Sequence, residues 1–153
     1  MDALKLWKDW TSDRGAELVE FALTFPLLLL VCMGIIDFGL MFHRYEVLTN
    51  AAREGARVSV LPGYTNADVT VRVNQFLQAT SLNPASVVTT VGATQTLAVG
   101  GGSCITVKPV TVTYTHTYSF VGGVARYFDK NLTSKALRAT ASMRNEIPAA
   151  ACP

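Results

Sequence analysis

Residues 21–42 read FALTFPLLLLVCMGIIDFGLMF, and this apolar run decides how the chain is organised. Its only charged side chain is Asp37, and its only other polar side chain is Thr24. A helix of this length rises about 33 Å, close to the ~30 Å thickness of the hydrocarbon core of a bilayer. The run therefore predicts a transmembrane helix over about residues 21–42.

A cleaved secretory signal is the alternative interpretation of this run. Such signals carry an apolar stretch of roughly 7–15 residues that is followed by small residues at the cleavage site. Small residues do follow the run at Asn50, Ala51 and Ala52, but the run itself is longer than such a stretch. We therefore favour a retained anchor. Lys and Arg number three on each flank, so the positive-inside rule does not choose an orientation.

The composition narrows the class of protein. A chain of 153 residues with 50% hydrophobic and 16% charged side chains has room for one small domain besides the anchor. A net charge of +2 argues against nucleic-acid binding. Three cysteines and two histidines without CxxC or HExxH predict neither a metal site nor a cofactor. An envelope enzyme, the weaker alternative, would need convergent titratable groups, and no spacing places a nucleophile beside His116.

The helical pattern continues beyond the apolar run. Apolar and small residues recur every three or four positions as far as Val60, and the Pro62-Gly63 pair then ends the pattern. We expect one helix over residues 16–60. Pro26 lies inside it and predicts a kink, because proline lacks a backbone donor and crowds the preceding turn.

The rest of the chain, residues 61–153, predicts a small domain of class α+β. Thr65 or Asn66 is a candidate N-cap for a second helix that ends at the Asn83-Pro84 pair. Glycines at 100–102 and at 122–123 predict a loop and a turn. Runs rich in Val and Thr predict an antiparallel sheet packed on helix, with strands at 86–91, 96–99, 104–107, 109–120 and 135–143.

The segment before the apolar run carries the most specific pattern in the chain. Gly15 is followed by AELVEF. This order resembles the class III signal peptide of type IV pilins and pseudopilins, in which a polar leader ends in Gly and a Glu stands at the fifth mature position. With Ala16 counted as the first mature residue, Glu20 is the fifth and Phe21 the sixth. The resemblance implies that a prepilin peptidase cuts between Gly15 and Ala16 and removes residues 1–15.

One family is closer still. The runs VEFALTFPLLLLVCMGIIDFG and LTNAAREGAR resemble the N-terminal module of the TadE and TadG family, whose members are minor pseudopilin-like components of the tight-adherence, or Flp pilus, system. The likeness covers residues 14–60. The matching residues are Gly15, Glu20, Phe21, Pro26, Asp37, Phe38, Gly39 and Asn50, Ala51, Ala52, Arg53, Glu54, Gly55, Ala56 and Arg57.

The resemblance implies a pilus or secretion subunit in bacterial adhesion and not an enzyme. The leader would be cytoplasmic, the helix would cross the inner membrane once, and the domain would be periplasmic, or extracellular in the pilus. The implied partners are the prepilin peptidase, other pilin or pseudopilin subunits, the Tad assembly platform and the membrane. The alternative is an uncleaved single-pass inner-membrane protein with a periplasmic binding domain.

Three residues in the helix are candidates for assembly contacts. Glu20, next to Phe21, is either an interfacial carboxylate or the partner of the new amine that cleavage creates on an adjacent subunit. Asp37 is either an interfacial residue in water or a buried partner for a neighbouring subunit. Small residues also share one helix face, which admits another helix at close range or packs on the chain's own sheet; they are Ala51, Ala52, Gly55 and Ala56.

The cysteines divide by position. Cys32 lies in the apolar run, where a lone thiol packs as a small hydrophobe. Cys104 and Cys152 would both lie in the oxidising periplasm. We expect a disulfide between them that ties the C-terminal tail to the sheet.

Overall fold

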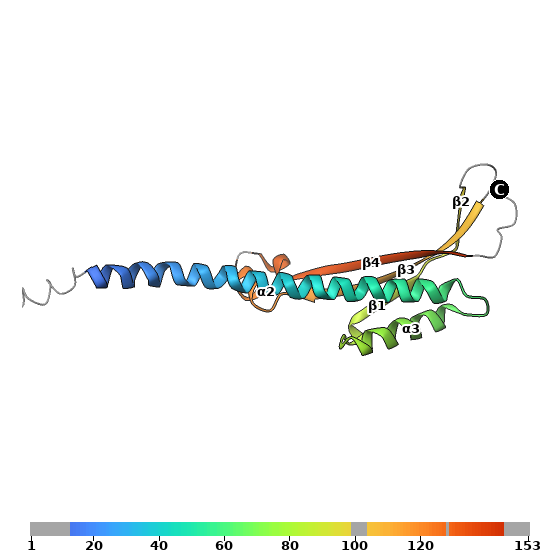
Figure 1. Cartoon of the computed structure of the whole chain (residues 1–153), viewed down its shortest axis with the longest axis horizontal. Helices are drawn as coiled ribbons and strands as arrows, with labels where there is room; N and C mark the ends of the chain where they lie inside the picture. The colour runs from blue at the N-terminus through green and yellow to red at the C-terminus, as the bar shows by residue number, and fades with distance from the viewer. Residues whose placement is uncertain (1–12, 99–103, 128, 146–153) are drawn as a thin grey trace, which may run out of the picture.

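The computed structural model describes residues 13–98, 104–127 and 129–145. One helix, α2 (Asp13–Ser59), is 47 residues long and runs along most of the molecule. Its N-terminal half stands bare, whereas a second helix and a sheet lie along its C-terminal half (Figure 1). The α+β fold with a long apolar N-terminal helix is the one that the sequence predicts.

The long helix ends and the second begins where the sequence signals lie. The backbone turns after Ser59, and Gly63 adopts a φ of 84°, a left-handed conformation that glycine tolerates. The second helix, α3 (Asn66–Ala79), is capped by Thr65 in a capping box with Asp68. The Thr65 hydroxyl donates a hydrogen bond to Asp68 and lowers the pKa of that carboxyl.

The end of α3 differs from the prediction. The helix ends at Ala79, before the Asn83-Pro84 pair, because Ser81 turns the backbone with a φ of 60°. Asn83 instead caps a short 3-10 helix, η2 (Pro84–Ser86), by accepting a hydrogen bond from the Ala85 amide at 3.0 Å.

Four strands form an antiparallel sheet around one long strand. The strands are β1 (Val87–Val91), β2 (Gln95–Ala98), β3 (Cys104–Thr117) and β4 (Ser134–Asn145). Both β1 and β2 pair with one edge of β3, and β4 pairs with the other. The registers place Thr89 and Ala139 opposite Val112 from the two sides.

The separate strands predicted at 104–107 and 109–120 are wrong, because β3 runs through Pro109 without a break. The residue lies opposite the gap between β1 and β2, since β1 pairs up to Val110 and β2 begins its pairing at Val107. The Gly92 amide donates to the Pro109 carbonyl at 2.8 Å, so the missing N–H of the proline faces the same gap. A proline is tolerated there because no strand requires its donor.

The predicted strand end at Phe120 and the turn at residues 122–123 are also wrong. The strand β3 ends at Thr117, and residues Val121–Ala125 form a short helix, α4. A 3-10 helix, η3 (Lys130–Thr133), then leads into β4. The Asp37 carboxylate binds the backbone amides that a longer strand would need, as described below.

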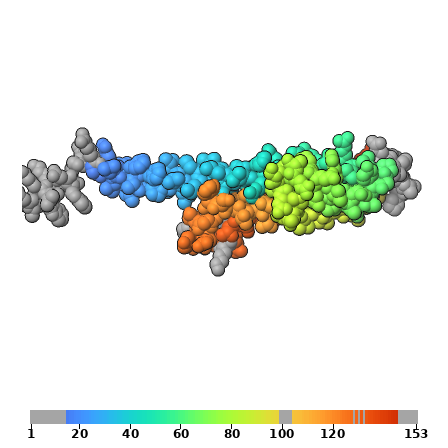
Figure 2. Space-filling model, turned by 90° about the horizontal axis from the view of Figure 1, so that it is seen from below, coloured from blue at the N-terminus to red at the C-terminus, as the bar shows by residue number. Residues whose placement is uncertain are grey.

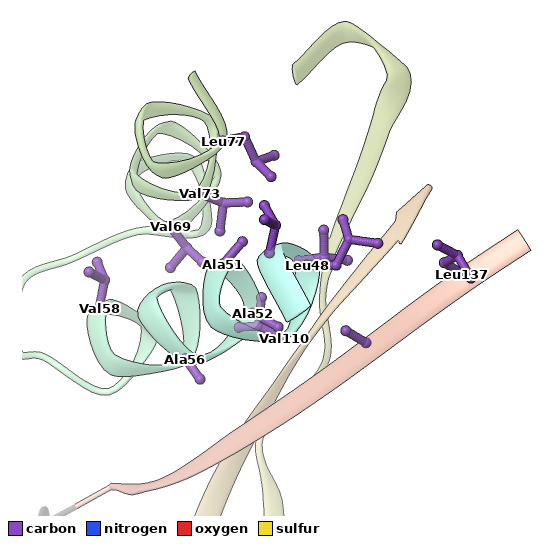
Figure 3. Close-up of a cluster of buried hydrophobic side chains, with 13 residues drawn as sticks. Leu48, Ala51, Ala52, Ala56, Val58, Val69, Val73, Leu77, Val110 and Leu137 are labelled. Atoms are coloured by element: carbon purple, nitrogen blue, oxygen red, sulfur yellow. The ribbon is translucent and has the colours of Figure 1, made fainter. Parts of the chain in front are cut away.

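The core lies between the C-terminal half of α2, the helix α3 and the inner face of the sheet (Figure 3). The inner face of β4 carries Leu137 and Ala139, as the period-two pattern predicts. The buried apolar residues of this core are Val47, Leu48, Ala51, Ala52, Ala56, Val58, Val69, Val73, Leu77, Val110, Val112, Leu137 and Ala139.

Candidate functional site

The bare half of α2 exposes apolar side chains around its circumference. Leu23 is 75% exposed, whereas Leu48 on the covered half of the same helix is fully buried. Among the described residues, α2 is the one helix long and apolar enough to cross a membrane, and its most apolar window is not buried by the rest of the chain. A single N-terminal helix of this kind fits a single-pass membrane protein.

The predicted processing and assembly residues lie at the start of this bare half. Gly15 and Ala16 lie in the first turn of α2, and the leader residues 1–12 lie outside the described residues. Phe21 stacks on Phe25 with ring centroids 5.2 Å apart. The Glu20 side chain is exposed, and no ion pair reaches it from the described part of the chain. Its pairing with the new N-terminal amine of an adjacent subunit stays a prediction.

Asp37 is buried by a distant segment of its own chain. The residue is only 1% exposed, because residues 119–121 of the same chain cover it. Its carboxylate accepts three backbone hydrogen bonds, from Ser119 at 3.1 Å, Phe120 at 2.9 Å and Val121 at 2.7 Å. The pattern fixes the connection between β3 and α4 to the middle of α2. An assembly role of Asp37 toward a neighbouring subunit stays a prediction.

Aromatic side chains extend this contact toward the core. The ring of Phe38 meets the edge of Tyr118 with centroids 5.9 Å apart. The Tyr118 hydroxyl lies 3.3 Å from the Met41 sulfur, and the His116 ring packs against the Tyr118 ring at 5.1 Å. The predicted strand face of Tyr114, His116 and Tyr118 thus packs along α2.

Arg44 reaches the same face of the sheet from the next turn of α2. Its guanidinium donates to the Tyr114 hydroxyl and to His116 Nδ1, both at 2.9 Å. His116 Nδ1 therefore accepts, and Nε2 then carries the proton and has no hydrogen-bond partner among the described residues. Burial lowers the pKa of His116, and the charge of Arg44 lowers it further, while Asp37 opposes the shift. The sequence did not single out Arg44, because its partners are about seventy positions away.

The small-residue face of α2 is occupied by the chain itself. A Cβ added at Gly55 would lie 2.7 Å from Val73 of α3 and 3.1 Å from Val110 of β3. Beside this contact, Arg72 of α3 forms an ion pair with Glu54 of α2 at 2.7 Å. Of the two alternatives, the structure therefore shows packing within one chain, with α3 as the closely approaching helix.

The side chains that could bind a metal ion or form a disulfide are the last group to place. Within residues 13–98, 104–127 and 129–145, no group of three or more His, Cys, Asp or Glu side chains could hold a metal ion. Cys32 is a free, exposed cysteine on the bare half of α2. Cys104 begins β3, but Cys152 lies outside the described residues, so the disulfide between them stays a prediction.

Comparison with known proteins finds a family that resembles the helix α2, which carries several of these residues. The model of the TadE-like protein family matches residues 15–57, from Gly15 almost to the end of α2. No curated protein and no solved structure matches the chain. The match includes Glu20, Asp37 and the small-residue face, and it confirms the family that the sequence suggested. Over residues 15–57 the chain is similar to the TadE-like protein family, and this similarity links it to the Tad pilus system.

Proposed function

We propose that this chain is a non-enzymatic, pilin-like subunit that a prepilin peptidase cuts after Gly15 and that then assembles into a Tad-type pilus or secretion filament for adhesion. One observation carries the proposal. The TadE-like match coincides with a single helix whose first half is apolar and uncovered and whose second half is built into a folded domain. Such a helix both anchors a subunit and presents it to others.

The uncovered half needs an apolar surrounding. Burying a Leu, Ile, Val or Phe side chain fully is worth about 1.5–3 kcal/mol, and the bare half exposes more than a dozen such side chains. In the membrane, lipid tails would cover them. In a filament, the equivalent helices of neighbouring subunits would replace the lipid and keep the same side chains out of water.

The proposed arrangement places the leader in the cytoplasm and residues 61–153 in the periplasm, and later in the extracellular pilus. The proposed partners are the prepilin peptidase, other pilin or pseudopilin subunits and the Tad assembly platform. Gly15 suits the peptidase because it has no Cβ to obstruct approach to the backbone, and the first turn of a helix opens easily. The uncleaved single-pass protein is the alternative.

The mature N-terminus separates these two functions. The protein would be expressed with and without its prepilin peptidase, and its mass and N-terminal sequence would be measured. We expect a chain that begins at Ala16 only where the peptidase is present. The Gly15→Leu variant should stay full length. Gly39→Leu is the matched control, because a side chain at Gly39 has open space around it, and it should be cut normally. A native protein that still begins near Met1 would establish the alternative.

Glu20 tests assembly apart from processing. The exposed carboxylate has no ion-pair partner within the described chain, and the amine of a cut neighbour would supply one in a low-dielectric setting. We expect Glu20→Gln to be cut normally and to lose its partner pilins in pull-down experiments. Glu17→Gln, which changes an exposed carboxylate one turn earlier, should keep them. Wild-type recovery of partners with Glu20→Gln would return Glu20 to the role of a simple interfacial carboxylate.

A further inference from the structure

The connection between β3 and β4 ends in an exposed apolar tip, which we define as residues 118–127. Tyr127 is 80% exposed, Phe120 46% and Val124 42%. Figure 2 shows this orange part standing out beside α2, at the end of the domain that adjoins the bare helix. Exposure of apolar side chains to water is unfavourable, so their clustering at this end of the domain indicates an apolar partner.

Contacts between the tip and α2 fix the height of the tip along this helix. Asp37 binds the amides of residues 119–121, and a Cβ at Gly34 would lie 3.9 Å from the Val121 side chain. The helix from Gly15 to Gly34 rises about 28 Å, close to the ~30 Å of a bilayer's hydrocarbon core. If the membrane begins at the first turn of α2 and not at Phe21, with Glu17 and Glu20 near its cytoplasmic edge, the tip lies where the hydrocarbon ends.

The chemistry of the tip matches that level. Tyrosine is enriched at membrane interfaces because its ring is apolar and its hydroxyl is polar. The Arg126 guanidinium lies over the Tyr127 ring, 5.6 Å from its centroid, and can reach lipid phosphates. The Asp37 carboxylate would be costly near lipid if it were unpaired, and its three backbone donors remove that penalty.

We propose that the tip of residues 118–127 is a membrane-binding element that inserts Phe120, Val124 and Tyr127 into the headgroup boundary of the outer leaflet. The partner of the tip is the lipid surface, because the tip continues the apolar surface of the anchor on the same side of the molecule. Asp37 then holds the tip at a fixed height and so sets how far the domain stands from the bilayer. The end of the predicted span, from Gly34 to Phe42, would lie at the interface and not in the hydrocarbon. The inference rests on the proposed membrane anchoring of α2.

Fluorescence quenching by brominated lipids tests the element in the full-length chain. Trp7 and Trp10 are replaced by Phe, and a single tryptophan is then introduced as Tyr127→Trp. A second reporter, Tyr64→Trp, marks the exposed turn before α3 at the far end of the domain. A third, Leu29→Trp, marks the bare helix. Each protein is reconstituted into phosphatidylcholine vesicles with bromine either near the headgroup or near the end of the acyl chains.

We expect the tryptophan at position 127 to lose most of its emission to shallow bromine and little to deep bromine. The reporter at 64 should be quenched by neither, and the reporter at 29 by both. If the reporter at 29 is quenched but the one at 127 behaves like the one at 64, the tip does not touch lipid and this inference alone is wrong. If the reporter at 29 is not quenched, the anchoring fails and the inference fails with it. If the tryptophan at position 127 is protected from quenching by bromine only at high protein density, a second copy of the chain covers the tip. That result also overturns the proposal.

Discussion

The two halves of α2 share one backbone and differ in what surrounds them. The first half carries large apolar side chains on every side and is contacted by little of the chain, whereas the second half carries alanine and glycine where α3 and the sheet approach. Large side chains suit a fluid surrounding such as lipid, which adapts to any shape. Small side chains suit a close-packed protein interior, where neighbouring backbones must come near. The size of the side chains along α2 therefore distinguishes the half that packs inside the domain from the half that the rest of the chain leaves uncovered.

The largest expected difference between the halves concerns a leucine in each. Leu48→Ala should lower the free energy of unfolding of the domain by about 2–5 kcal/mol, because Leu48 is fully buried and its loss leaves a cavity. Leu27→Ala is the matched control, since Leu27 is 71% exposed in the bare half and should leave domain stability nearly unchanged. Denaturant unfolding of the detergent-solubilised protein measures both. Equal losses for the two variants would contradict the division of the helix.

Asp37 marks the boundary between the halves. We expect Asp37→Asn to weaken the docking of residues 118–127 by about 1.5–3 kcal/mol, because an amide offers one acceptor oxygen to three donors and turns its own N–H groups toward them. Hydrogen exchange at the amides of residues 119–121 would report the loss as faster exchange. Glu46→Gln, at an exposed carboxylate on the same helix, is the control and should leave these amides protected.

Two glycines of α2, Gly55 in the covered half and Gly39 where the helix is open, allow the same comparison with a smaller expected change in stability. Gly55→Ala should lower domain stability by about 1–3 kcal/mol, because its Cβ would overlap Val73 in a well-packed core. Gly39→Ala should be neutral or stabilising by up to ~1 kcal/mol, since the site is open and alanine favours the helix. Thermal unfolding of both variants in one detergent distinguishes them. A Gly55→Ala variant as stable as wild type would mean that α3 can shift away from α2 without loss.

Much of this fold follows from local signals. The apolar run, the Pro62-Gly63 stop, the Thr65 cap and the alternation of β3 and β4 each act within a few residues, and each appears in the structure near its expected position. The errors arise where distant residues decide. The continuity of β3 through Pro109 depends on where β1 and β2 end, and the early end of β3 depends on Asp37, about eighty positions earlier.

The candidate site divides in the same way. Sequence alone singled out Gly15, Glu20 and Asp37 as candidates, because their spacing relative to the apolar run follows a family pattern, and their roles in processing and assembly stay predictions. The partners of Asp37 could not be predicted, since they are backbone amides and carry no side-chain signal. The contact of Arg44 with Tyr114 and His116 is likewise invisible in the sequence, because an arginine just past an apolar run resembles any interfacial charge.

The smallest expected effect concerns the pH dependence of the covered half. Burial lowers the pKa of His116 below its ordinary value of about 6.5, and Arg44 adds to the shift while Asp37 opposes it. The folded protein therefore prefers neutral His116, and the unfolded chain binds the proton first. His116 contributes stability that is fully present above about pH 6.5 and is lost as the pH falls through the lowered pKa of the folded state.

The measurement is domain stability between about pH 7 and pH 5, a window above the ordinary range of carboxyl titration. Wild type should lose stability across this window. The His116→Gln variant keeps an acceptor for Arg44 and should lose less. His43 is exposed on α2, so His43→Gln should retain the wild-type slope. The effect is the smallest of the four because the carboxylate of Asp37 attracts a charged His116 and so offsets part of the cost of protonation. An identical slope in wild type and His116→Gln would show that protonation of His116 does not strain the contact between β3 and α2.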